Sequence, residues 1–296
     1  MKKHLHIQIL LSLLLAGCAS NTIEFTREMA TATEVPNKTT LQAGFRYSSY
    51  GPAYNPGPEY WPYAGEQVAA KFTNATPSAL WIVGILDGEG TYLNFECKTD
   101  DPNIRCGYAD MNDAIFDLFD EKGFEVWLQV EPGNASVDEL IKIVLNKYKD
   151  HPSVVGFGLD VEWYKSTNGP EGQPVTDEDA KRWVTSIRKI NPNYRLFLKH
   201  WDAAWMPPTY RDGIVFINDS QQFESFDQLM DDFTAWGETF APAPVGYQYG
   251  YPADKKWWHE LQDPPAEIGQ AILNDIPNTQ GLFWVDFTLL DIFPPQ

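Results

Sequence analysis

The chain has 296 residues, of which 43% are hydrophobic and 14% aromatic, and its formal net charge is −19 at pH 7. A surface this acidic repels nucleic acids and anionic polymers, so we expect a neutral or cationic partner and no nucleic acid. The length and apolar content are sufficient for one sizeable core, and a single β/α barrel commonly has this size.

The N-terminal residues 1–17 have the pattern of a secretory signal. Lysines precede an apolar run that begins at Ile7 and is too short to span a bilayer stably. The tetrapeptide "LAGC" that ends at Cys18 resembles the lipobox of bacterial lipoproteins. The resemblance implies a lipidated Cys18 and, because Ala19 rather than Asp follows, the outer membrane of a Gram-negative cell. An ordinary signal peptide with an incidental cysteine is the alternative.

Residues 18–40 are polar, threonine-rich and aperiodic, which is typical of a tether. The remaining cysteines, Cys97 and Cys106, lie close together in "CKTDDPNIRC". Outside the cytoplasm such a pair predicts a disulfide that closes a short loop. No histidine or third cysteine stands beside them, so we expect no metal and no cofactor. We further expect a monomer whose only contact with the membrane is the lipid anchor.

From residue 41 onward, short apolar runs alternate with amphipathic segments of helical period. The apolar runs predict strands at about 43–48, 79–86, 124–130, 153–162, 194–200, 213–218, 244–249 and 281–287. Helix signals occupy most of the segments between them; in one of these, Ser136 and Glu139 form a capping box. Eight strands with mostly helical crossovers predict a single (β/α)8 TIM barrel over residues 41–296 rather than a doubly wound sheet.

The fourth predicted strand ends in "GFGLDVEWY", which carries Asp160 and Glu162. Side chains alternate between the faces of a strand, so Val155 and the apolar residues at the following odd positions face the helices. The even positions, from Gly156 to Tyr164, then face the barrel interior. Active sites of this fold lie at the carboxyl ends of the strands, so we expect both acids in the mouth of the barrel. A buried polar layer or a loop-capping pair is the alternative.

Two carboxylates at positions i and i+2 stand about 6–7 Å apart along a strand. Like charges at that distance raise the pKa of one of them, and enclosure by Trp and Tyr adds to the shift. The result is one protonated acid beside one carboxylate, which is the pair that cleavage of a glycosidic bond requires.

The segment "GFGLDVE" resembles the fourth-strand signature of family-18 glycoside hydrolases, the chitinases and their relatives, which ends in Asp-x-Glu. The resemblance implies that Glu162 is the general acid/base and that Asp160 orients the N-acetyl group of the substrate, which acts as nucleophile. Gly156, Asp160 and Glu162 match the signature. Val155 and Gly158 stand where the signature has its two earlier acids. This departure from the signature argues against the substrate-assisted mechanism.

Later strands extend the resemblance. The segment "GLFWVDF" is similar to the last strand of that family, which implies that Trp284 forms the floor of a sugar subsite. Tyr247 or Tyr249 in "GYQYGY" would supply the tyrosine that positions the substrate, although on a different strand. "LDVE" and "YQY" are also similar to family-25 lysozymes, but "GFRYSSYGP" has no counterpart of their first-strand Asp.

Further candidates stand where other predicted strands end. Glu131 precedes a Pro-Gly pair and is a possible second catalytic acid, and Asp202 is an alternative partner for Glu162. Asp286, Trp201 and Tyr164 are candidates for binding the sugar, together with the aromatic-rich segment "YSSYGPAYNPGPEYWPY", which has the composition of a loop. Ordinary hydrogen bonding for the acids and loop packing for the aromatic rings are the alternatives.

Taken together, these patterns predict a lipid-anchored TIM-barrel glycoside hydrolase that cleaves a neutral or amino-sugar polysaccharide. The alternative is a glycan-binding lipoprotein that keeps the barrel without catalysis. The loss of two signature acids favours this binder, whereas the intact pair of Asp160 and Glu162 favours the enzyme.

Overall fold

The computed structural model describes residues 40–166 and 172–295; the predicted signal peptide, Cys18 and nearly all of the predicted tether lie outside them. The strands are β1 (Gln42–Tyr47), β2 (Thr76–Asp87), β3 (Gly90–Leu93), β4 (Ile104–Cys106), β5 (Glu125–Val130), β6 (Val154–Asp160), β7 (Arg195–Lys199), β8 (Ile214–Asn218), β9 (Val245–Tyr249) and β10 (Thr279–Val285). The α-helices are α1 (Tyr60–Ala69), α2 (Asp113–Lys122), α3 (Val137–Tyr148), α4 (Asp177–Ile190), α5 (Phe226–Phe240), α6 (Lys255–Trp258), α7 (Pro264–Asp275) and α8 (Asp286–Ile292). Short 3-10 helices are η1 (Val161–Trp163), η2 (Ala203–Trp205) and η3 (Pro252–Asp254).

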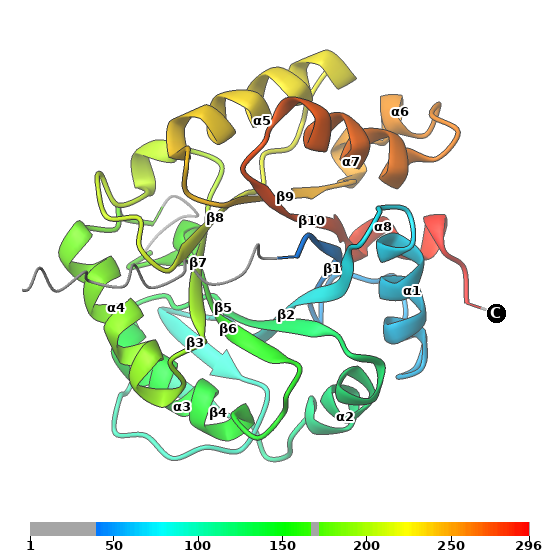
Figure 1. Ribbon diagram of the computed structural model, residues 1–296. Helices are drawn as coiled ribbons and strands as arrows, with labels where there is room; N and C mark the ends of the chain where they lie inside the picture. Colours follow the sequence, from blue (N-terminus) through cyan, green and yellow to red (C-terminus); the bar gives the residue numbers. More distant parts are fainter. Residues whose placement is uncertain (1–39, 167–171, 296) are drawn as a thin grey trace, which may run out of the picture. The chain divides into compact units, whose positions relative to one another are not determined.

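Eight parallel strands close into a barrel, and helices surround it on the outside (Figure 1). The ring runs β1, β2, β5, β6, β7, β8, β9, β10, and the pairing of β10 with β1 closes it. Each of the eight predicted strands corresponds to one strand of this ring, so the (β/α)8 prediction is confirmed. Among the described residues, no helix is long and apolar enough to cross a membrane.

The structure differs from the sequence prediction in several places. Strands β3 and β4 were not predicted; β3 runs antiparallel to β2 and extends the sheet beyond the ring. Helix α1 begins inside the aromatic-rich segment that we expected to be a loop, and its Trp61 is buried. The fourth barrel strand ends at Asp160 rather than at residue 162, because the chain turns there into η1.

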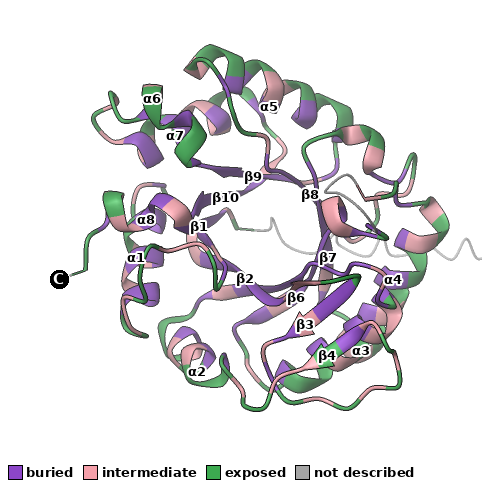
Figure 2. Cartoon of the chain, turned by 180° about the vertical axis from the view of Figure 1, so that it is seen from behind, coloured by how far each residue is buried: buried purple, intermediate pink, exposed green. Residues whose placement is uncertain are grey.

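Two apolar cores result from the alternation of side chains along the strands. The inner core fills the barrel and consists of Leu80, Trp127, Phe197, Val215, Ile217 and Phe283. The larger outer core lies between the strands and the helices, whose outward faces are exposed (Figure 2). Val155, which we expected to face the helices, packs against the inner core because the pairing of β5 with β6 is irregular at that end.

The glycines of β6 leave room for the inner core. A Cβ atom added to Gly158 would lie 2.0 Å from the ring of Phe197, so only glycine fits at this position. Phe157 and Leu159 point the other way and belong to the outer core. The predicted alternation of this strand is therefore confirmed from Gly156 to Asp160.

Backbone contacts at Gly133 and its neighbour connect three loops at the carboxyl ends of the strands. It forms an isolated bridge with Tyr164, and its carbonyl accepts a hydrogen bond of 2.9 Å from the backbone N–H of Lys165. The next residue, Asn134, donates its N–H to the carbonyl of Glu89 at 2.7 Å. The loops that follow β2, β5 and η1 are thus joined through backbone contacts.

The predicted disulfide between Cys97 and Cys106 is present, with a Cα–Cα distance of 5.4 Å. Because it closes a short loop, the chain-entropy relation gives a stabilisation of about 2–3 kcal/mol. We expect the Cys97→Ser/Cys106→Ser variant to lose this amount in urea unfolding. The intact mass of the oxidised wild-type protein should be about 2 Da below that of the reduced form. Two titratable thiols in folded protein isolated from an oxidising compartment would contradict the bridge.

Candidate active site

Two adjoining cavities open where the barrel strands end. The central cavity has a volume of about 160 Å³ and is lined by Arg46, Tyr50, Ile82, Gln129, Glu131, Asp160, Glu162, Trp163, Lys199, Asp219, Gln221, Tyr251 and Phe287. The side cavity, of about 390 Å³, shares three of these residues and is lined by Glu162, Trp201, Asp219, Ser220, Gln221 and Gln222. Active sites of TIM barrels occupy this edge, so these cavities form the candidate active site.

Lys199 is the central cation of the site. Its ammonium lies 2.9 Å from Oδ2 of Asp160 and also contacts Oδ2 of Asp219. Burial disfavours the charged ammonium, but Asp160 and Asp219 raise the pKa of Lys199 well above its usual range. One positive charge is therefore shared between two carboxylates. The sequence analysis missed Lys199, although its position two residues after the inward-facing Phe197 was an available signal.

Asp160 lines the central cavity and is only 2% exposed. Its Oδ2 also accepts a hydrogen bond of 3.1 Å from the side-chain amide of Gln129. Burial raises the pKa of Asp160 well above its ordinary value, Lys199 opposes this shift, and Glu162 and Asp219 add to it. Asp160 is thus held in a fixed position by two donors.

Glu162 lies on η1, is half-buried and lines both cavities. Burial raises the pKa of its carboxyl to about 7; Lys199 opposes the shift, and the carboxylates of Asp219 and Glu131 increase it. The direction is the one expected from the sequence, but the neighbours that contribute differ from the expected Asp160. A carboxyl group with this pKa can both hold and release a proton at neutral pH.

Glu131 lines the central cavity as the sequence analysis anticipated, and it is buried. The hydroxyl of Tyr50 donates to its Oε1, and the backbone N–H of Leu86 donates to its Oε2 at 2.8 Å. These two donors fix the orientation of the carboxylate beside Glu162.

Asp286 does not line either cavity, although we expected it to bind the sugar. It is fully buried, and its Oδ1 accepts a hydrogen bond of 2.8 Å from the guanidinium of Arg46. The backbone N–H of Ser48 donates to its other oxygen. Asp286 therefore braces Arg46, which does line the central cavity.

The three aromatic residues taken from the family resemblance point away from the barrel mouth, which corrects that expectation. Tyr247 packs on Phe233 of α5, and the hydroxyl of Tyr249 donates to a carbonyl at the start of α7. Trp284 packs against Trp258 of α6. Along β9 and β10 these positions share the outward direction of Val245 and Leu282, because side chains alternate.

Four other aromatic side chains line the central cavity, where Tyr247, Tyr249 and Trp284 were expected. They are Tyr50, Trp163, Tyr251 and Phe287. Tyr50 comes from the aromatic-rich segment that the sequence analysis marked for sugar binding. Phe287 follows Asp286 directly, and its ring lies 4.6 Å from the guanidinium carbon of Arg46.

Of Tyr164, Trp201 and Asp202, only Trp201 lines one of the two cavities at the barrel mouth. It is 39% exposed in the side cavity and stacks on His200 at 4.1 Å. Tyr164 turns outward beyond η1 and packs edge-on against Trp183 of α4. Asp202 caps η2 by accepting a hydrogen bond of 2.9 Å from the N–H of Ala204.

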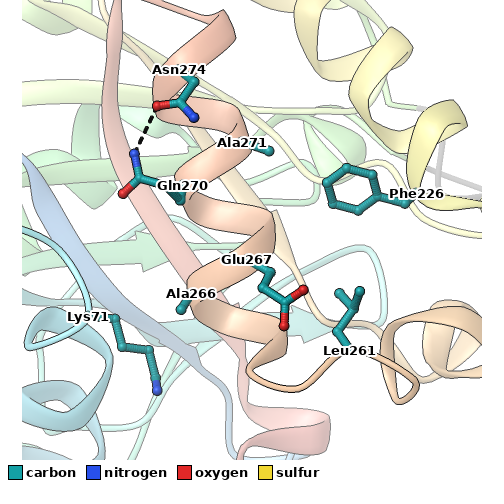
Figure 3. A pocket seen from close by; sticks show the side chains of 8 residues that line it. All are labelled: Lys71, Phe226, Leu261, Ala266, Glu267, Gln270, Ala271 and Asn274. Atoms are coloured by element: carbon teal, nitrogen blue, oxygen red, sulfur yellow. Dashed lines mark hydrogen bonds between the residues drawn. The ribbon is translucent and has the colours of Figure 1, made fainter.

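A larger cavity, of about 590 Å³, lies outside the barrel on the exposed side of α7 (Figure 3). Its polar side chains include Gln270 and Asn274, which hydrogen-bond to one another at 3.0 Å. It shares no residue with the two cavities at the barrel mouth.

Asp117, Asp120 and His151 form the one group in the described residues whose side chains could together hold a metal ion. His151 Nδ1 lies 2.7 Å from Asp120, and Nε2 lies 3.2 Å from Asp113. Burial disfavours the charged ring, but these two partners raise the pKa of His151 above its ordinary value of 6.5. These ion pairs explain why the side chains lie together: they link the loop before β6 to α2.

This cluster predicts a pH-dependent stability. Because the folded-state pKa of His151 is raised, its stabilisation is complete below the unfolded pKa and is lost as pH rises through the folded value. We expect His151→Gln to lower the free energy of unfolding more at pH 5.5 than at pH 9. Urea unfolding at both pH values measures this, with the exposed His259→Gln as control. An equal loss at both pH values would contradict it.

Comparison with known proteins shows the fold alone. No family model matches the chain, and no curated protein matches it. A solved structure described as a candidate α-L-fucosidase from Bacteroides thetaiotaomicron superposes with a TM-score of 0.51 at 9% identity, covering 89% of this chain and 91% of that one. Others are β-glucuronidase 2 from Bacteroides uniformis (TM-score 0.49, 14% identity) and a β-D-glucuronidase from Dictyoglomus thermophilum (0.46, 11%). Each is matched over 83% of this chain, which spans 30% and 43% of their respective lengths.

Proposed function

We propose that the protein is a glycoside hydrolase that acts on a neutral or amino-sugar polysaccharide, with Glu162 as the general acid/base. The observation that carries this proposal is a half-buried carboxyl with a pKa of about 7 that faces two cavities at the mouth of a TIM barrel. Such a carboxyl holds a proton at neutral pH and can deliver it to the leaving oxygen of a glycosidic bond.

Cleavage of a glycosidic bond also needs a second carboxylate, which either activates water or attacks the sugar. We assign Asp160 as the partner of Glu162, with Lys199 and Gln129 holding it in place. Glu131 lines the same cavity and is the alternative for this role. Because Trp284, Tyr247 and Tyr249 face the helices, the proposal does not include the substrate-assisted mechanism of family 18.

The proposal is tested by incubating the soluble domain, from about residue 40, with a panel of polysaccharides and measuring new reducing ends. We expect at least one neutral or amino-sugar glycan to be cleaved. The exposed Trp201 in the side cavity would also suit a protein that binds glycans without cleaving them. Binding to glycans without release of reducing ends, by protein of verified fold, would favour that second function.

For localisation, the proposal rests on the lipobox-like tetrapeptide that ends at Cys18. We expect wild-type protein to incorporate labelled fatty acid and to fractionate with the outer membrane. Cys18→Ser should take up no label and should be released or mislocalised. Wild-type protein without label would contradict the lipid anchor but would leave the hydrolase proposal intact.

A further inference from the structure

Three aromatic rings close one side of the central cavity. Tyr251, Phe287 and Tyr50 follow β9, β10 and β1, which are neighbours in the ring of strands. The ring centroids of Tyr251 and Phe287 lie 6.3 Å apart, and those of Phe287 and Tyr50 also lie 6.3 Å apart. This separation is typical of packed aromatic pairs. All three residues line the central cavity, and we call them the aromatic wall.

The boundary of the cavity continues from the aromatic wall past β2 to β6. The hydroxyl of Tyr50 donates to Oε1 of Glu131, which directly follows β5. Because β2 lies between β1 and β5 in the ring, this hydrogen bond spans the β2 side of the cavity. The N–H of Leu86 on β2 donates to the other oxygen of Glu131 at 2.8 Å. Beyond β5, Glu162 and Trp163 of η1 line the cavity after β6.

The remaining sector of the central cavity faces the side cavity. It lies between β6 and β9, where the two cavities share Glu162, Asp219 and Gln221. The central cavity, of about 160 Å³, is smaller than the about 300–1,000 Å³ that is typical of sites for drug-sized ligands, so it suits a single sugar ring. The side cavity, of about 390 Å³, falls within that range and can take the adjoining part of a chain.

The positions of the carboxyl groups decide which end of a chain enters the central cavity. In the proposed reaction Glu162 gives its proton to the leaving oxygen, and the second carboxylate acts at the anomeric carbon. Both candidates for the second carboxylate, Asp160 and Glu131, line the central cavity but not the side cavity. The sugar whose anomeric carbon reacts therefore occupies the central cavity, and the leaving part of the chain occupies the side cavity.

We infer that the protein removes single sugars from the non-reducing end of a glycan chain, because a chain that continued past the central cavity would meet the aromatic wall. This inference rests on the proposed function. In each turnover the bond between the anomeric carbon and the leaving oxygen breaks, and that oxygen takes the proton of Glu162. Water supplies the hydroxyl group that the anomeric carbon gains and the proton that Glu162 regains. The products are one monosaccharide and a chain shorter by one unit.

The test uses full-length mature protein and hexamers of glucose, xylose, mannose and N-acetylglucosamine, each labelled with 2-aminobenzamide at the reducing end. Chromatography early in the reaction separates the labelled products by length. We expect the labelled pentamer to exceed every shorter labelled product by about tenfold or more, because the wall raises the barrier for internal bonds. If no hexamer is cleaved, the polysaccharide that yields reducing ends replaces them, and monosaccharide should then be its main early product.

Variants of Tyr50 show whether the aromatic wall sets the product length. Tyr50 is 51% exposed, so Tyr50→Ala should fold, and we expect it to raise the share of shorter labelled products by about tenfold. Tyr50→Phe keeps the ring and removes only the hydrogen bond to Glu131, so it should keep the wild-type product pattern. Tyr54→Ala is the matched control, because Tyr54 is 56% exposed in the same loop and lines neither cavity at the barrel mouth.

Labelled products of many lengths early in the reaction overturn the inference, as does release of a labelled monosaccharide, which would come from the reducing end. Either result leaves the hydrolase proposal standing, because new reducing ends have formed. An unchanged product pattern in Tyr50→Ala also overturns the inference, since the wall would then not stop the chain. If protein of verified fold releases nothing from any hexamer or polysaccharide, the proposed function fails together with the inference.

Discussion

Replacing Glu162 with glutamine is expected to lower turnover on a cleaved glycan by about 10²–10⁴-fold, because the amide keeps the shape of the side chain but has no proton to transfer. Affinity for the glycan should persist, since rings such as Trp201 and Tyr251 line the cavities independently of this carboxyl. Initial rates of reducing-end release and calorimetric binding measure the two effects separately.

The matched control is Glu238→Gln, the same change at an exposed position of α5, which should leave turnover unchanged. If Glu162→Gln retained near-wild-type turnover, Glu162 would not be the general acid. Glu131 would then be the next candidate, because it lines the same cavity.

The pH dependence of the reaction follows from the same group. With a pKa of about 7, the acid form of Glu162 is complete well below pH 7 and is lost as the pH rises through that value. The rate should therefore fall on the alkaline side, with an apparent pKa that belongs to the coupled carboxyl groups. Asp160→Asn leaves Lys199, whose charge lowers the pKa of Glu162, less neutralised, so it should move this limb to lower pH.

Replacing Lys199 with methionine is expected to lower the free energy of unfolding by about 3–5 kcal/mol. The substitution leaves Asp160 and Asp219 buried without the cation that they share. Urea unfolding at pH 7 measures the loss. The exposed pair of Lys255 and Asp291 provides a control, since Lys255→Met should cost only about 0–1 kcal/mol.

A rescue experiment shows whether uncompensated charge is the cause. Adding Asp160→Asn and Asp219→Asn to Lys199→Met should restore part of the lost stability, because the amides carry no charge that needs the ammonium. A loss no larger than that of Lys255→Met, or a triple variant less stable than Lys199→Met, would show that the buried ion pairs are not what Lys199 contributes.

The sequence was sufficient to predict the barrel and the position of Glu131, Asp160 and Glu162 at its mouth, but not that of Asp202 or Asp286. Each barrel strand is a short apolar run, and alternation from Gly156 to Asp160 correctly directs Asp160 inward. The same alternation, counted from Phe197, directs Lys199 inward, but its partnership with Asp160 depends on the register that pairs β6 with β7. That register joins residues far apart in the chain and is not encoded in either segment alone.

The assignments of Tyr247, Tyr249 and Trp284 were wrong for a different reason. A motif resemblance gives the residue type near a strand end but does not determine which face the side chain occupies. Trp284 follows the inward-facing Phe283 and therefore points outward, and Tyr247 and Tyr249 share the direction of Val245. Alternation counted from the apolar positions would have placed all three in the outer core.

The backbone contacts at Gly133, which join the loops after β2, β5 and η1, form a junction that limits which parts of the site can change in evolution. Gly133 has a φ of +52°, and an added Cβ atom would lie 2.6 Å from the carbonyl oxygen of Glu89, so substitution there would disturb the loops joined to it. An insertion in one of these loops would pull on the others and displace Glu131 and Glu162 together. The segment after β7 is itself joined to the loop after η1, through the hydrogen bond from the N–H of Val175 to the carbonyl of Trp205. Variation in substrate range among descendants of this chain should therefore accumulate in the segment after β8, which carries Gln221.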